Sequence, residues 1–275
     1  MTTALRPLGL GELLDRSFFL YRKHFALFVG IVALPHLLLL AFQLLGVGFG
    51  SQSGGVFAAR YWFWLIPTLI LQLGVTAASQ GATVVAVSNV HLDRTATISS
   101  AFLGIRGRIL LIALITIVVG IMIGFASLFL LVPGIFLALA FALVIPVAVL
   151  EDSGMWDSIS RSWELTKGSR LRILVIYILY FFLLYTFILL WEIPILAAIG
   201  VLAARGHNPA MMPLWTQIAI PICAFLSLSL VTPLITIALS LTYYDQKVRK
   251  EAFDLQHMMA MLDSAPSGAA PALPG

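Results

Sequence analysis

ILLIALITIVVGIMIGFASLFLLVPGIFLALAFALVIPVAVL, residues 109–150, decides the fold, because none of its residues carries a charge. An α-helix rises about 1.5 Å per residue, so roughly 20 apolar residues cross a hydrocarbon core of about 30 Å. The stretch is long enough for two crossings, at residues 109–132 and 135–150. LVPG, residues 131–134, has room only for a tight turn between them. We therefore expect two antiparallel neighbouring helices.

The composition of the chain indicates that similar apolar segments occur along its whole length. Hydrophobic residues make up 61% of the 275 residues and charged residues 10%, with a mean hydropathy of +1.04. A soluble fold of this length cannot bury so much apolar surface. Further spans are expected at residues 25–49, 61–90, 173–204 and 214–242. The predicted fold class is an all-α membrane protein with six transmembrane helices as three hairpins and with cytoplasmic amphipathic interfacial helices.

Local signals refine the boundaries of these spans. SQSGG, residues 51–55, is a turn signal that ends the first span. YWFW, residues 61–64, begins the second with rings that suit a membrane interface. WEIP, residues 191–194, interrupts the long fifth run, so we expect a kink there and a remainder that is tilted or lies at the outer interface. Pro221 and Pro233 predict bends in the sixth span.

The basic residues predict the orientation. Six spans place 14 lysines and arginines on one side, namely Arg6, Arg16, Arg22, Lys23, Arg94, Arg106, Arg108, Arg161, Lys167, Arg170, Arg172, Lys247, Arg249 and Lys250. Only Arg60 and Arg205 fall on the other side. The positive-inside rule makes the first side cytoplasmic, with both termini inside, and we expect the bacterial inner membrane. This distribution explains the pI near 9.4 without a nucleic-acid partner. The N-terminal segment lacks a cleavable signal pattern, so the first run is expected to be a retained span.

Three segments, residues 15–31, 97–115 and 157–178, each place an amphipathic stretch and basic residues before a span that runs outward. In the third, i, i+4, i+7 spacing puts Asp157, Arg161 and Glu164 on one helical face. Trp156, Ile159 and Trp163 lie on another, which predicts a helix at the level of the lipid head groups.

The ends of the chain give the remaining organisation. We expect an amphipathic N-terminal segment at residues 1–24 and a cytoplasmic amphipathic helix at 243–263, after the transmembrane domain at 25–242. The helix has apolar residues at helical spacing: Tyr244, Val248, Ala252, Leu255, Met259 and Leu262. Residues 264–275 are rich in Pro, Gly, Ala and Ser and are expected to be a disordered tail.

Four stretches resemble a family of bacterial six-span proteins related to the membrane domain of some glycerophosphoryl diester phosphodiesterases. They are LGELLDRSFFLYRKHF (10–25), VPGIFLALAFALVIPVAVLED (132–152), SISRSWELTKGSRLRIL (158–174) and YYDQKVRKEAFDL (243–255). In the fused relatives the diesterase chemistry belongs to a separate barrel domain, for which this chain has no room. The resemblance therefore implies a membrane module of undefined activity and argues against phosphodiesterase activity.

Two ionisable side chains lie inside apolar runs. Glu192 is either a proton, cation or ligand site within the bundle, or a carboxylate near the outer interface beside Trp191, and its distance from Arg172 favours the second interpretation. His36, after Pro35, is either a metal or proton-relay residue, or a neutral histidine bonded to a backbone carbonyl that the proline leaves without a donor.

The second span has a polar face that includes Gln72 and Gln80. Such a face either lines a substrate path or marks close helix packing in lipid, and small residues nearby favour packing. The five histidines form no recognisable metal-binding motif, and Cys223 has no second cysteine to pair with. We expect neither a metal nor a cofactor.

The remaining candidates lie on the predicted cytoplasmic side. Basic side chains there either bind anionic lipid head groups or a phosphorylated ligand, or only set the orientation. The candidate lipid or partner contacts are Arg106, Arg108, Arg161, Arg170, Arg172, Tyr243, Tyr244, Asp245, Arg249 and Lys250.

Three functional hypotheses follow. The first is a non-enzymatic accessory or scaffold module of the cell envelope that contacts membrane lipids or a cytoplasmic protein partner. The second is a small transporter or lipid-handling protein with a cavity between hairpins, lined by Glu192 and the Gln72 face. An intramembrane enzyme needs paired acid and base groups at one depth, and the sequence has none.

Overall fold

The computed structural model describes residues 9–48, 59–205 and 213–264. Helices are the only regular elements in these residues: α1 (Leu10–Lys23), α2 (Phe25–Gly48), α3 (Ala59–His91), α4 (Ile98–Gly104), α5 (Ile109–Phe129), α6 (Leu131–Ala140), α7 (Val144–Leu150), α8 (Met155–Thr166), α9 (Arg170–Ala204) and α10 (Leu214–Ser264). The predicted turn at 51–55, residues 1–8 of the N-terminal segment and residues 265–275 of the predicted tail lie outside the described residues.

Six segments of the described chain are long and apolar enough to cross a membrane, as expected of a multi-pass membrane protein. They are Phe25–Val47, Trp62–His91, Ile109–Phe129, Leu131–Leu150, Arg170–Leu202 and Leu214–Glu251. The prediction of an all-helical protein with six such segments is confirmed. The grouping into three hairpins and the role of the amphipathic helices stay predictions.

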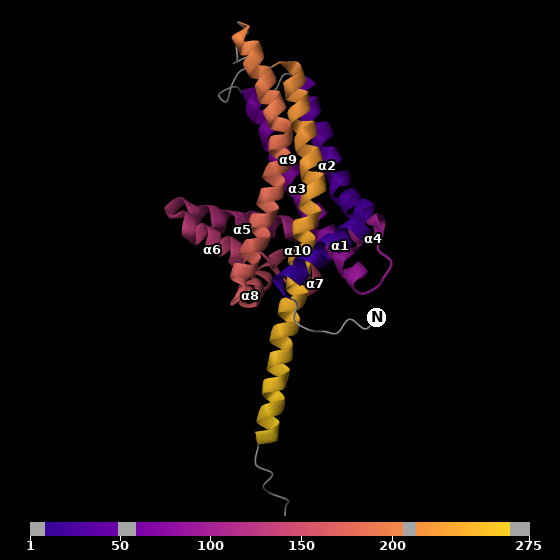
Figure 1. Ribbon diagram of the computed structural model, residues 1–275, viewed down its shortest axis with the longest axis vertical. Coiled ribbons are helices and arrows are strands. Elements are labelled where there is room, and N and C mark those ends of the chain that lie inside the picture. Colours follow the sequence, from indigo (N-terminus) through magenta and orange to yellow (C-terminus); the bar gives the residue numbers. More distant parts are fainter. Residues whose placement is uncertain (1–8, 49–58, 206–212, 265–275) are drawn as a thin grey trace, which may run out of the picture.

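Four of these helices form the long axis of the molecule. The helices α2, α3, α9 and α10 run alongside one another, and α10 packs against each of the other three. The short helices α1, α4, α7 and α8 gather at one end of this bundle (Figure 1). We call this the polar end, because it also carries the charged residues of α10 from Asp245 to Glu251.

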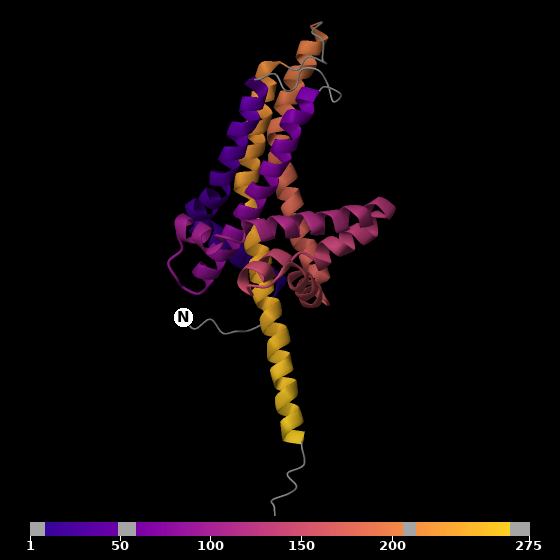
Figure 2. The same cartoon turned by 180° about the vertical axis from the view of Figure 1, so that it is seen from behind.

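The α5–α6 pair departs from the bundle. Both helices project sideways near the polar end, in the view of Figure 1 and in the reverse view of Figure 2. Much of the pair is exposed apolar surface, including Leu128 at 80% and Val132 at 74% exposed. Such a surface requires lipid or another apolar neighbour, because water does not solvate it favourably.

The connection between α5 and α6 is shorter than predicted. Only Leu130, with φ −158° and ψ 141°, leaves the helical conformation. Pro133 and Gly134, which the sequence suggested as turn residues, lie in the first turn of α6. Proline fits there because the first helical N–H groups have no partner within the helix. Gly134 permits close packing, since a Cβ at this position would lie 3.0 Å from the Cα of Ser127.

The fourth predicted span is not one continuous helix. It divides into α6, with 10 residues, and α7, with 7, separated by a turn at residues 141–143. At 1.5 Å per residue α6 is about 15 Å long, roughly half of a hydrocarbon core. The predicted fourth span thus contains a break, although Leu131–Leu150 as a whole is long and apolar enough to cross a membrane.

The fifth and sixth spans are each one continuous helix. The helix α9 passes through Pro194 for 35 residues, so WEIP does not end the helix, and the predicted kink there stays a prediction. The helix α10 continues for 51 residues through Pro221 and Pro233. The predicted cytoplasmic helix at 243–263 is therefore a continuation of the last span. Packing by neighbouring helices allows a helix to retain its path at a proline.

The short helices bury one face and expose the other. In α1 the buried residues Leu13, Ser17 and Leu20 follow i, i+4, i+7 spacing. In α8 the buried face contains mainly small hydroxyl residues, while Trp156 is 66% exposed. The predicted apolar face of α8 is thus divided, because Ile159 is buried in the protein and Trp156 is not.

Candidate functional site

Three consecutive residues of α10, Tyr243, Tyr244 and Asp245, connect the elements of the polar end. Each of the three side chains bonds to a different part of the chain: Glu151 after α7, Ser88 on α3 and Arg172 on α9. Successive positions on a helix differ by about 100° around its axis, so neighbouring residues face different partners. We refer to these three residues as the triplet.

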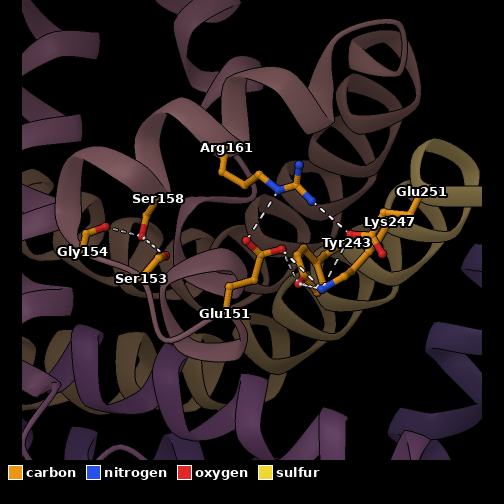
Figure 3. Close-up of polar contacts among 8 residues, drawn as sticks. All are labelled: Glu151, Ser153, Gly154, Ser158, Arg161, Tyr243, Lys247 and Glu251. Carbon is orange, nitrogen blue, oxygen red and sulfur yellow. Dashed lines mark hydrogen bonds and ion pairs between the residues drawn. The ribbon is translucent and has the colours of Figure 1, made fainter. Parts of the chain in front are cut away.

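Tyr243 is 1% exposed and donates a hydrogen bond of 2.8 Å to Oε1 of Glu151. The ammonium group of Lys247, one turn along α10, lies 3.3 Å from the Tyr243 oxygen and 3.5 Å from the same carboxylate oxygen. Figure 3 shows these groups meeting at one point. The phenol and the ammonium together compensate the half-buried carboxylate, whose desolvation would otherwise be costly.

The Glu151 carboxylate also connects α8 to α10. Its Oε2 lies 3.5 Å from Nε of Arg161, and Nη2 of Arg161 lies 3.1 Å from Oε1 of Glu251 (Figure 3). Glu251 is in turn 3.8 Å from the Lys247 ammonium. Two carboxylates and two cations therefore alternate across three elements, an arrangement that fixes geometry better than an isolated surface pair does.

Tyr244 faces α3. Its hydroxyl donates to Oγ of Ser88 at 2.9 Å, and its ring stacks on His91 with centroids 4.8 Å apart. Both partners lie in the last turn of α3. This contact fixes the end of α3 against α10.

Asp245 is the charged residue of the triplet, and its side chain is 0% exposed. Its Oδ2 accepts hydrogen bonds of 2.9 Å from Nη1 of Arg172 and 2.9 Å from Nε of Arg249. Removing either the acid or its cations would leave a buried charge uncompensated, which costs about 3–5 kcal/mol in typical cases. Asp245 therefore locks the start of α9 to α10.

The triplet was predicted as a candidate lipid or partner contact. Tyr243 and Asp245 are buried and all three side chains have partners within the chain, so they offer little surface to another molecule. We interpret the triplet as an internal connection.

Most of the basic candidates also have partners within the chain. Arg108 pairs with Asp152 and donates to the Ala148 carbonyl at 2.8 Å. The Arg170 guanidinium lies over the rings of Phe136 and Trp163, at 4.1 and 4.6 Å from their centroids. Arg161, Arg172 and Arg249 join the ion pairs above. Lys250 donates to the Glu164 carbonyl near the end of α8, where a cation also complements the helix dipole.

Arg106 is different from these residues. It is exposed, and it has no ion-pair partner within the described part of the chain.

Hydroxyl groups of α8 stabilise the break between α6 and α7. Ser162 donates to the Ala140 carbonyl at 2.9 Å and accepts from the Leu143 N–H at 3.2 Å. Thr166 donates to the same carbonyl at 3.1 Å. A broken helix is tolerated at membrane depth only where other groups satisfy its backbone. One turn earlier Ser158 bonds to Ser153 and to the Gly154 carbonyl, which fixes the start of α8 (Figure 3).

Glu192 lies where the fifth run was expected to approach the outer interface. It is exposed and borders a pocket of about 140 Å³ between α9 and α10 that also contains Cys223 and Ser227. The Ser227 hydroxyl is buried without a hydrogen-bond partner in the described chain. The rest of the pocket wall is apolar.

The polar residues of the early spans do not form one path. His36 is 5% exposed, and its Nδ1 lies 2.8 Å from the Val32 carbonyl, which is not the Ile31 carbonyl that Pro35 leaves without a donor. Gln72 donates to Thr76 at 3.2 Å on its own helix. Gln80 instead borders a separate cavity beside α5.

The helix α1 is joined to the bundle by a tyrosine. Tyr21 donates to the Leu230 carbonyl of α10 at 2.7 Å. Burial raises the pKa of Tyr21 to about 12, so this hydroxyl remains a donor at neutral pH.

Comparison with known proteins adds no relative: no protein-family model, no curated protein and no solved structure matches the chain. The described residues contain no group of three or more histidine, cysteine or acidic side chains that could hold a metal ion. The resemblance to the membrane domain of the phosphodiesterases is not tested by these comparisons.

Several important residues were not recognised in the sequence. Glu151, Lys247 and Glu251 were not selected because their partners are far away in sequence, and only the fold brings them together. The hydroxyls of Ser158, Ser162 and Thr166 did carry a signal, since they recur at i, i+4, i+8 on one helical face. That spacing predicts a small-residue packing face against another backbone.

Proposed function

We propose that the protein is a non-enzymatic accessory module of the bacterial cell envelope, anchored in the inner membrane with both termini in the cytoplasm. In this proposal it presents the end of α10 to a cytoplasmic protein partner. One observation carries the proposal: α10 continues to Ser264 and stands apart from every other helix beyond the polar end (Figures 1 and 2).

An isolated helical end of this length is marginally stable in water. Its sequence keeps the apolar residues Leu255, Met259 and Leu262 at helical spacing, which favours a partner over free solvent. The contacts of the triplet fix the base of this helix, so it is held at a defined position relative to the other helices.

The distribution of basic residues supports the orientation. Fourteen lysines and arginines against two favour the polar end as the cytoplasmic end. Those that remain exposed there include Arg22, Lys23, Arg94, Arg106 and Lys167. A basic side chain near an anionic membrane surface contributes about 1 kcal/mol, so this set supports contact with anionic head groups.

We further infer that α2, α3, α9 and α10 cross the bilayer fully, while the α5–α6 pair lies within the cytoplasmic leaflet. The sideways direction of the pair and the short length of α6 support this arrangement. The pair leaves and returns on the same side, so the predicted sidedness of both termini is unchanged.

A shared origin with the membrane domain of glycerophosphoryl diester phosphodiesterases remains part of the proposal. It rests on the four similar stretches of sequence, two of which contain the triplet and the hydroxyl face of α8.

Copurification from bacterial membranes tests the partner. Replacing Leu255, Met259 and Leu262 with serine should abolish recovery of the partner while the amount of membrane-inserted protein stays normal. A matched variant with Asp254, Gln256 and His257 changed to serine should retain the partner. Equal recovery with both variants would contradict the proposal.

A further inference from the structure

A cavity of about 340 Å³ opens where α5 leaves the bundle. Residues of α3, α5, α9 and α10 and of the α6–α7 segment form its wall. Its volume falls within the usual range of about 300–1,000 Å³ for small-molecule sites. The cavity thus lies at the base of the sideways α5–α6 pair, in a part of the protein that the ion pairs of the polar end do not reach.

The wall of the cavity carries no charge. Its lining consists of aliphatic and aromatic residues with six polar ones, namely Gln80, Thr116, Tyr177, Tyr180, Thr232 and Thr236. A charged head group placed here would lack a compensating ion, so the lining excludes anionic and cationic ligands on energetic grounds.

Most of the polar groups already have partners. Thr116 donates to the Ile112 carbonyl at 2.8 Å, and Thr236 donates to the Thr232 carbonyl at 3.2 Å. The Tyr180 hydroxyl is hydrogen-bonded to the Thr232 side chain. Each of these four residues thus has a polar partner within the protein.

Gln80 and Tyr177 are different. Neither side chain has a hydrogen-bond partner among the described residues, although both are half-buried on the cavity wall. An amide N–H₂ and a phenol O–H are both hydrogen-bond donors. In a lipid environment an unpaired donor is unfavourable unless a ligand or a water supplies an acceptor.

The occupant that fits is an uncharged amphiphile with a carbonyl acceptor beside hydrocarbon. We propose that the cavity binds a neutral carbonyl-bearing lipid, whose carbonyl oxygen accepts a hydrogen bond from Gln80 or Tyr177 and whose chain runs along the exposed α5–α6 pair. Acyl esters of neutral glycerolipids and the ring carbonyls of isoprenoid quinones share this chemistry. This site goes beyond the proposed function and does not depend on the partner of α10.

Photo-crosslinking of the purified protein in nanodiscs tests the site. Three diazirine probes are compared: a diacylglycerol, a quinone analogue and an anionic phosphatidylglycerol. Preferential labelling of α5 or α9 by either neutral probe supports the proposal and identifies the source of the carbonyl. Equal labelling by all three probes would overturn it, since it would indicate only contact with bulk lipid.

Variants connect the labelling to the two donors. Of Gln80→Leu and Tyr177→Phe, the variant that removes the donor bonded to the carbonyl should reduce labelling by the neutral probe about fivefold, the effect of one lost hydrogen bond. Gln72→Leu is the matched control on the same helix, because Gln72 bonds to Thr76 outside the cavity. Labelling that is unchanged in both donor variants would overturn the proposal. It would indicate that water accepts the hydrogen bonds of the two donors.

A third variant blocks the cavity without touching either donor. Gly120 of α5 lines the cavity, and a Cβ there meets no atom within 4 Å, so we expect Gly120→Leu to fold and to narrow the cavity. It should reduce labelling by the neutral probe to the level of the anionic probe while the thermal midpoint stays near that of the wild type. Undiminished labelling in this variant would place the lipid elsewhere.

Discussion

The polar end and the α5–α6 pair differ in the kind of side chain that they contain. At the polar end, the triplet and its partners bury charged and hydroxyl groups in specific pairs, with Asp245 fully enclosed between Arg172 and Arg249. The α5–α6 pair has no charged residue and leaves Leu128 and Val132 largely exposed. Directional bonds specify position, whereas apolar contact with lipid does not. The polar end is therefore expected to be rigid, and the pair to adapt to its surroundings.

The largest effect is expected at Asp245. Changing Asp245→Asn leaves Arg172 and Arg249 without their shared carboxylate, and the folded state should lose about 3 kcal/mol, the low end of the range because both arginines are partly exposed. Thermal unfolding in detergent measures this loss. Asp93→Asn is the control, because Asp93 is exposed and its φ of 53° suits asparagine. An equal shift in both variants would show that the buried carboxylate of Asp245 contributes no more to stability than an exposed one does.

The next prediction concerns the turn between α6 and α7. It tests whether hydroxyl groups of α8, at the polar end, also stabilise the segment that follows the α5–α6 pair. Ser162→Ala removes two hydrogen bonds to buried backbone groups and should destabilise the protein by about 2 kcal/mol. Ser160→Ala, on the exposed face of the same helix, should change stability by less than about 0.5 kcal/mol. Chemical denaturation compares the two. If Ser162→Ala behaves like its control, hydroxyls of α8 do not maintain the break.

The sequence predicted the number and type of the long helices because length and lack of charge are local properties. It placed the turn at residues 131–134 rather than at Leu130, since proline and glycine also suit the first turn of a helix. It selected the triplet but assigned it to lipid or a partner. Its partners within the chain, Glu151, Ser88 and Arg172, are distant in sequence, and no local pattern identifies them.

Within the α5–α6 pair, glycine tests the packing between the helices. Gly134→Leu would force a side chain toward the Ser127 backbone and should cost about 1–2 kcal/mol. Gly124→Leu on α5 is the matched control, because a Cβ there meets no atom within 4 Å. Disulfide trapping between the two helices, on a background with Cys223 replaced by serine, reports the pairing. Trapping that is equally efficient in both variants would argue against close packing at Gly134.

The smallest effect is expected at Tyr21. Tyr21→Phe should lower stability by about 1 kcal/mol at neutral pH, because the Leu230 carbonyl loses its donor. The folded-state pKa of about 12 exceeds the ordinary value of 10, so the contribution of Tyr21 is complete below pH 10 and is lost as the pH rises through 12. Unfolding midpoints measured from pH 9 to 12 should meet for the two proteins between pH 10 and 11 and then cross, because only the wild type must ionise a buried phenol above that pH. Parallel curves would contradict a buried phenol at this position.

Labelling at the tip of the α5–α6 pair tests the central contrast most directly. Single cysteines at Leu130, Asp93 and Arg205, each with Cys223→Ser, are exposed in intact spheroplasts to a membrane-impermeant maleimide. We predict reaction at Arg205→Cys alone, with Leu130→Cys reacting only with a membrane-soluble maleimide. Reaction of Leu130→Cys with the impermeant reagent as fast as Arg205→Cys would show that the pair crosses the bilayer, and would contradict the account.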